Sequence, residues 1–81
     1  MSSSYETLKK IFTDDLKVPA DLVAPEATLK DMEFDSLALV ELAVILEREL
    51  GVDIPEDELK EAVTLGDMAV LVDDRIARTS A

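Results

Sequence analysis

The stretch Phe34-Asp35-Ser36-Leu37-Ala38-Leu39-Val40-Glu41-Leu42 decides how the rest of this 81-residue chain is interpreted. It places a single serine, between an acid and a leucine, at the point where an irregular segment becomes a strongly apolar helix. That helix is predicted over residues 36–50 and ends at Gly51, a residue type that accepts the left-handed conformation just past a helix. A serine at this boundary offers a hydroxyl that solvent and a partner enzyme can both reach.

The predicted helix is apolar on nearly all of its faces. At 100° per residue, the face predicted to join the core carries Leu39, Leu42, Ala43, Leu46 and Leu50. The opposite face carries Leu37, Val44 and Arg48, with Glu41 beside them. Two interpretations stay open: neighbouring elements cover both faces, or the outer face is a docking surface ringed by acidic residues.

Helical spacing of apolar residues predicts three further helices. The first covers residues 4–16, opens on a Ser-x-x-Glu capping box at Ser3 and ends before Pro19. A short third helix is predicted at about 56–62, with Leu59 and Val63 as its apolar contacts. The last helix runs from a cap at residues 64–67 to about residue 78, followed by a frayed tail, and places Arg75 in its last turn.

The predicted fold class is all-α, a four-helix bundle with a short third helix and a long loop between helices 1 and 2. That loop, residues 17–35, is expected to be pinned onto the core by five apolar residues: Leu22, Val23, Leu29, Met32 and Phe34. No repeat or second domain is apparent, so residues 1–81 are predicted to form one domain with its core at about 5–77.

Acidic residues dominate the charge, because nineteen of them stand against eight basic ones and give a formal net charge of −11. Since 48% of the residues are hydrophobic, the chain can fold, and the acid must lie on its surface. Such a surface repels nucleic acid and anionic membranes, and steers the protein towards basic patches on other proteins. We expect the protein to lie in the cytoplasm, since the first ten residues contain no apolar signal region. We also expect it to be a monomer.

The residue types needed for autonomous catalysis are missing. Without cysteine or histidine, Ser-His-Asp and Cys-His arrangements and zinc sites built on those residues are excluded. No calcium loop of the Asp-x-Asp-x-Asp-Gly type is present. We therefore expect no enzyme, and interpret Ser36 as a point of attachment. The alternative is that Ser36 or Asp35 simply caps the helix, although neither has an acid three residues later.

In a short acidic chain, Asp35-Ser36-Leu37 at the start of the second of four helices resembles the acyl carrier protein family. The resemblance covers roughly residues 5–77 and includes Asp31-Met32, Val40-Glu41-Leu42 and Gly51-Val52-Asp53-Ile54-Pro55. It implies a 4′-phosphopantetheine arm covalently attached to Ser36, transferred from coenzyme A by a separate Mg²⁺-dependent phosphopantetheinyl transferase. The thiol of the arm would hold acyl intermediates as thioesters and present them to partner enzymes.

The resemblance also implies roles for individual residues. Asp35 would sit at the metal site of the transferase or hold the local geometry, and Leu37 would insert into partner pockets. Basic patches on a ketosynthase, an acyltransferase or other acyl-processing enzymes would face the recognition-helix positions, which are Glu41, Val44 and Glu47. The candidate lining of an acyl-chain pocket, with plain core as the alternative, is Leu46, Leu59 and Ala62.

Two departures from the family pattern bear on the pathway. Glu33 stands where the family commonly has glycine, and Arg48 occupies a position that is often acidic in fatty-acid carriers. Both favour a carrier of polyketide or other antibiotic biosynthesis over one of fatty-acid biosynthesis. Peptidyl and aryl carriers of nonribosomal pathways usually show a Gly-Gly-x-Ser motif and less acid. Outside the family, the alternative is an unmodified acidic helical protein-interaction domain.

Overall fold

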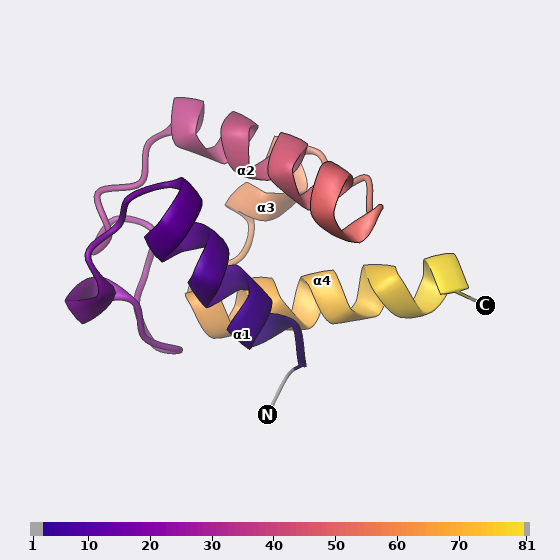
Figure 1. Cartoon of the computed structure of the whole chain (residues 1–81), viewed down its shortest axis with the longest axis horizontal. Coiled ribbons are helices and arrows are strands. Elements are labelled where there is room, and N and C mark those ends of the chain that lie inside the picture. Colours follow the sequence, from indigo (N-terminus) through magenta and orange to yellow (C-terminus); the bar gives the residue numbers. More distant parts are fainter. Residues whose placement is uncertain (1–2, 81) are drawn as a thin grey trace.

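The computed structural model describes residues 3–80, which contain four α-helices (Figure 1). They are α1 (Ser3–Lys10), α2 (Ser36–Leu50), α3 (Glu56–Lys60) and α4 (Leu65–Ser80). Within this range the only extended pairing is an isolated bridge between Thr28 and Thr64. The predicted all-α class is confirmed, and α2 has the predicted bounds. None of the described helices is both long enough and apolar enough to span a bilayer.

The first predicted helix, residues 4–16, consists of two helical types. After α1 the chain continues as a π-helix at Ile11–Asp15, in which the Leu16 N–H donates to the Ile11 carbonyl at 3.0 Å. The capping box predicted at Ser3 lies outside the residues whose side chains are described. The start of α1 is instead held by α4, because the Ser4 N–H donates to Asp73 Oδ1 at 3.0 Å.

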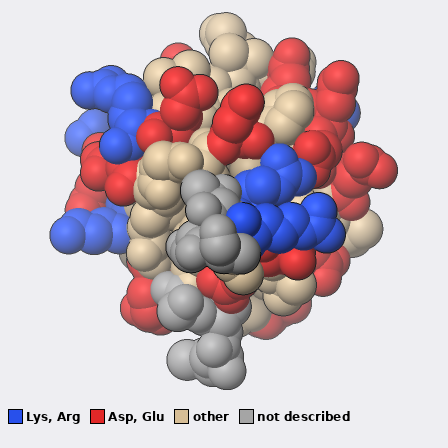
Figure 2. All heavy atoms as spheres, turned by 90° about the vertical axis from the view of Figure 1, so that its right-hand side faces the viewer, with Lys and Arg blue, Asp and Glu red and all other residues tan. Residues whose placement is uncertain are grey.

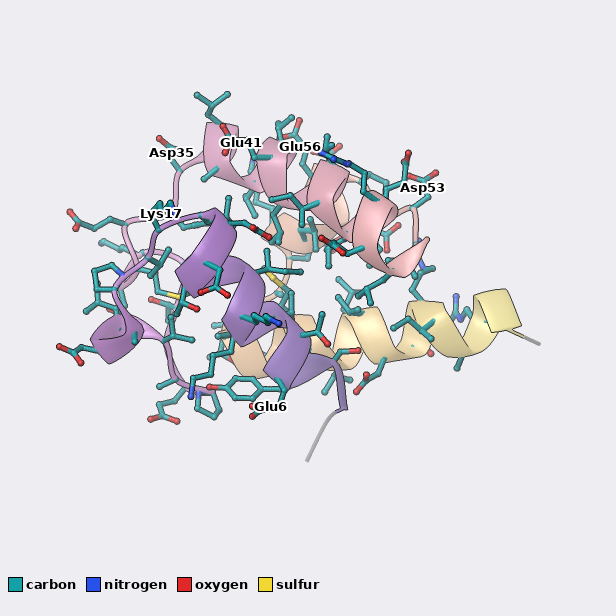
Figure 3. All side chains as sticks on the ribbon, viewed as in Figure 1. Glu6, Lys17, Asp35, Glu41, Asp53 and Glu56 are labelled. Atoms are coloured by element: carbon teal, nitrogen blue, oxygen red, sulfur yellow. The ribbon has the colours of Figure 1, made fainter. Side chains whose placement is uncertain are left out.

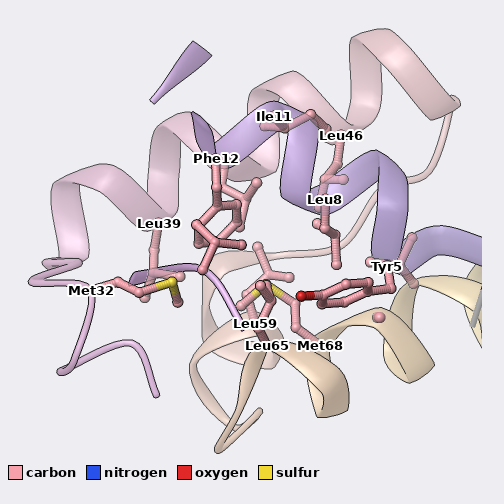
Figure 4. Close-up of a cluster of buried hydrophobic side chains, with 14 of the residues drawn as sticks. Tyr5, Leu8, Ile11, Phe12, Met32, Leu39, Leu46, Leu59, Leu65 and Met68 are labelled. Carbon is pink, nitrogen blue, oxygen red and sulfur yellow. The ribbon is translucent and has the colours of Figure 1, made fainter. Parts of the chain in front are cut away.

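All four helices contribute to one hydrophobic core (Figure 4). α1 packs against α4, and α2 packs against α3. The largest side chains that are completely buried include Leu8, Phe12, Leu42, Leu46, Leu59, Leu65 and Met68. The prediction for Val63 was wrong, since it is 66% exposed. Its helical spacing from Leu59 would place it on the buried face only if the helix continued, but α3 ends at Lys60 and does not include Val63.

The long segment between the first two helices is packed onto the core, with a short 3₁₀-helix at Ala20–Leu22. Its buried residues are Val18, Val23, Ala27 and Met32, while Leu29 and Phe34 are partly buried. Leu22 was wrongly predicted to be an anchor, since it is 37% exposed. It ends the 3₁₀ turn on the outside, and the next residue, Val23, takes the inward position.

This segment also closes the start of α4. The N–H groups of Leu65 and Gly66 donate to the carbonyls of Ala27 and Pro25, both at 2.8 Å. Thr64 and Asp67 form the predicted cap, each accepting from the other's backbone N–H at 3.1–3.3 Å. A Cβ on Gly66 would lie 3.0 Å from the Pro25 carbonyl oxygen, so glycine permits this close approach.

α3 is a helix of only five residues and has no side-chain cap. Arg75 of α4 forms an ion pair with Glu58 of α3 and donates from Nη1 to the Asp53 carbonyl at 2.9 Å. Arg75 was predicted in the last turn of α4, but the helix continues to Ser80. Its position inside the helix lets it fasten α3 and the preceding connection to α4.

Glu33, which stands where the family that the sequence resembles commonly has glycine, has a left-handed backbone with φ 54°. Replacing Glu33 by glycine removes a left-handed strain of about 1–2 kcal/mol from the folded protein. The greater conformational freedom of glycine in the unfolded chain cancels about 0.4–1 kcal/mol of this gain in stability. We therefore predict that Glu33→Gly raises the free energy of unfolding by about 0.5–1 kcal/mol in urea titrations.

The matched control is Glu61→Gly, because Glu61 is an exposed glutamate with φ −75° at the end of α3. There the same substitution should lower the free energy of unfolding, since glycine relieves no strain. Equal destabilisation by both substitutions would contradict the left-handed assignment of Glu33.

Candidate functional site

The start of α2 is capped by Asp35. Its backbone is extended, with φ −90° and ψ −179°, and its side-chain Oδ1 accepts a hydrogen bond from the Ala38 N–H at 2.9 Å. Its carbonyl also accepts the first bond of the helix, from the Leu39 N–H at 3.1 Å. Of the two candidate caps, Asp35 therefore caps the helix and Ser36 does not. A cap bonds to the N–H two or three residues later, and here Asp35 reaches it.

Ser36 is the first residue of α2 and is exposed to solvent. Within the described part of the chain, its hydroxyl has no hydrogen-bond partner. The N–H groups of Ser36 and Leu37 are likewise unpaired there, as expected for the first amides of a helix. The boundary thus presents one hydroxyl and two backbone donors together on the surface.

The two faces of α2 differ as the apolar pattern predicts. Leu39, Leu42 and Leu46 are at most 2% exposed, and Ala43 and Leu50 are partly buried. On the outer face Leu37 is 68% exposed and Val44 is 51% exposed. Neighbouring elements therefore cover only the inner face.

The outer face brings several of the predicted partner residues together. At 100° per residue, Leu37, Glu41 and Val44 lie within about 60° of one another around the helix axis. Asp35 and Glu41 lie along the outer edge of the molecule, with their side chains away from the other helices (Figure 3). Glu47 and Arg48 are exposed to either side of Val44. The result is an apolar surface flanked by both acidic and basic groups.

The three residues proposed to line an acyl-chain pocket have different surroundings. Leu46 and Leu59 are completely buried in the core. Ala62, in the connection after α3, is half-buried and lines a surface cavity of about 350 Å³ together with Glu58, Glu61, Asp67 and Leu71. That cavity includes Ala62 but neither of the two leucines.

Acidic side chains cover much of the surface. In the view along the molecule from the end where α4 finishes, they spread over the upper and right-hand parts, and Lys and Arg form separate groups (Figure 2). Four acids cluster in sequence around the start of α3: Asp53, Glu56, Asp57 and Glu58. Among the described residues, no group of carboxylates is arranged to hold a metal ion.

Comparison with known proteins identifies the family. A family model described as "Phosphopantetheine attachment site" matches residues 6–72, which include all of α2. The acyl carrier protein of Helicobacter pylori (strain G27) is 37% identical over 71 residues, which are 86% of this chain and 91% of that protein. The acyl carrier protein of Thermosynechococcus vestitus is 38% identical over 77 residues, 94% of this chain and 95% of that protein.

A third relative, the acyl carrier protein of Picosynechococcus sp., is 35% identical over 72 residues, 88% of this chain and 89% of that protein. The matches therefore extend over nearly the whole of each protein. The cofactor that goes with this family model is 4′-phosphopantetheine, attached to a serine. By family model and by relatives alike, the chain belongs to the acyl carrier protein family.

Proposed function

We propose that Ser36 carries the 4′-phosphopantetheine and that the chain is a non-catalytic carrier of acyl groups. The observation that carries this proposal is the hydrogen bond from the Ala38 N–H to Asp35 Oδ1. Because the aspartate caps α2, the serine hydroxyl has no structural task and remains exposed for a modifying enzyme.

The surroundings of Ser36 fit a phosphodiester. The unpaired N–H groups of Ser36 and Leu37 lie at the positive end of the α2 dipole, where phosphate oxygens are stabilised. Asp35 brings a negative charge, but the hydrogen bond from Ala38 holds its Oδ1 in the cap. When bound, the arm supplies a terminal thiol that holds an acyl group as a thioester, which no side chain of this cysteine-free sequence can do.

We assign partner recognition to the outer face of α2. Leu37 and Val44 provide exposed apolar area, and such side chains contribute most where a partner pocket desolvates them. Glu41 and Glu47 provide charges that attract basic patches and accelerate encounter. The partners in this proposal are the phosphopantetheinyl transferase and acyl-processing enzymes such as a ketosynthase or an acyltransferase.

The pathway that we favour is polyketide or other secondary-metabolite synthesis, with fatty-acid synthesis as the alternative. Arg48 supports this pathway, because the same position is often acidic in fatty-acid carriers. This exposed cation lies beside the recognition residues of α2, so it changes the charge that a partner enzyme meets. An acyl chain entering the four-helix bundle between α2 and α3 would have to separate Leu46 from Leu59, with Ala62 at the opening. In this proposal residues 1–81 act as one domain.

The attachment site is tested by intact mass after incubation with coenzyme A, Mg²⁺ and a broad-specificity phosphopantetheinyl transferase. We predict that the wild-type protein gains one phosphopantetheine group and that Ser36→Ala gains none. Thr64→Ala is the control, since it removes a hydroxyl at the start of α4 instead and should leave the gain intact. An unmodified wild-type protein, or a modified Ser36→Ala variant, would refute the assignment.

The recognition face is tested with Glu41→Gln and Glu47→Gln. For each variant we predict that the KM of the carrier for its transferase rises about threefold at low ionic strength, because each substitution removes a steering charge. The effect should disappear at about 1 M salt, where the screening length is about 3 Å. Glu6→Gln, at an exposed position on α1, is the control. An equal rise in that variant would show that only net charge matters.

A further inference from the structure

The residue immediately before the cap is held by an aromatic stack. The ring of Phe34 lies against that of Phe12, with ring centroids 4.8 Å apart and planes inclined by 14°. Phe12 belongs to the π-helix and is completely buried, whereas Phe34 is partly buried. Stacked aromatic pairs of this kind contribute more stabilising free energy than the burial of their apolar area alone would give. The stack therefore joins the π-helix to the segment that leads into α2.

Backbone hydrogen bonds hold the same segment. The Phe34 N–H donates to the Leu29 carbonyl at 2.8 Å, and the Glu33 N–H donates to the Lys30 carbonyl at 3.0 Å. Glu33 turns the chain through its left-handed conformation, and Asp35 then continues it in an extended one. Phe34 is the anchored residue between these two, so its position sets the direction in which Asp35 and Ser36 leave the loop.

We propose that Phe34 is a positioning residue for the attachment of phosphopantetheine, acting through its stack on Phe12. The proposal rests on the proposed role of Ser36. In that reaction Ser36 Oγ forms a bond to the phosphorus next to pantetheine in coenzyme A, and the pyrophosphate P–O bond breaks. The leaving group is 3′,5′-ADP, and the hydroxyl proton passes to a base of the transferase. The transferase can engage Ser36 productively only when the hydroxyl has the right orientation.

Loss of the stack should change a specific kinetic constant. If the segment before α2 takes several orientations, only a fraction of the carrier is competent at any moment. The apparent affinity for the transferase then falls in proportion to that fraction. Once bound in the competent orientation, Ser36 reacts as before. The KM for the carrier therefore rises while kcat stays the same, a split that a general loss of stability does not produce in a folded protein.

The experiment is steady-state kinetics of phosphopantetheinylation at saturating coenzyme A, with the carrier concentration varied. The variants are Phe34→Leu, Phe12→Leu and the double variant, each shown to be folded by circular dichroism. We expect each single substitution to raise the KM about tenfold at unchanged kcat, and the double variant to raise it no further. Phe34→Tyr retains an aromatic ring and should retain the wild-type KM. Val72→Ala, at a completely buried residue of α4, is the stability control and should also retain it.

The buried position of Phe12 makes the test decisive, because a completely buried ring cannot touch the transferase. A wild-type KM in Phe12→Leu, with a raised KM in Phe34→Leu, would mean direct contact between Phe34 and the enzyme and would overturn the proposal. An unchanged KM in both variants, or an equal rise in Val72→Ala, would also overturn it. A wild-type protein that gains no phosphopantetheine at all refutes the role of Ser36, and this inference with it.

Discussion

The hydrogen bond from the Ala38 N–H to the Asp35 carboxylate is the interaction on which the candidate attachment site depends. It ends the irregular segment, starts α2 and leaves Ser36 as the first helical residue. If Ser36 were the cap, its hydroxyl oxygen would accept a hydrogen bond from a backbone N–H of the first turn. The hydroxyl would then be less available for the attachment of a modifying group. Two adjacent polar residues thus divide two tasks: the acid stabilises the helix, and the alcohol faces solvent.

The long segment between the first two helices supports both this start and that of α4. Near its middle, the carbonyls of Pro25 and Ala27 accept from the first amides of α4. At its end, Phe34 stacks on Phe12 just before the Asp35 cap. A connection of this kind is a structural part of the core and not a tether. It explains how a chain of 81 residues without disulfides can hold an exposed serine in a defined place.

Local patterns were sufficient to predict the features that local forces determine. The bounds of α2 followed from apolar periodicity and from Gly51, whose left-handed φ of 68° is the conformation that favours glycine just past a helix. The Thr64–Asp67 cap followed from spacing alone. The sequence could not decide whether Asp35 or Ser36 is the cap, since both are favourable capping residues and only the backbone geometry shows which one it is. The exposed outer face of α2 likewise depended on which neighbours cover it.

Contacts between distant residues could not be predicted from spacing. Phe12 and Phe34 meet only once the long segment folds back, and Arg75 reaches Glu58 only because α4 runs past α3. Val63 is exposed because α3 is shorter than its apolar residues suggest. Family membership came from motifs spread over most of the chain, and the matches with acyl carrier proteins agree with it.

The division of tasks between Asp35 and Ser36 is tested most directly by the free energy of unfolding of two variants, measured in urea on the unmodified protein. The structure predicts that Asp35→Ala loses about 1 kcal/mol, the usual cost of removing a cap. Ser36→Ala should stay within about 0.5 kcal/mol of the wild-type protein, as exposed substitutions normally do. A loss in Ser36→Ala as large as that in Asp35→Ala would mean that the serine hydroxyl caps the helix, and would contradict this account.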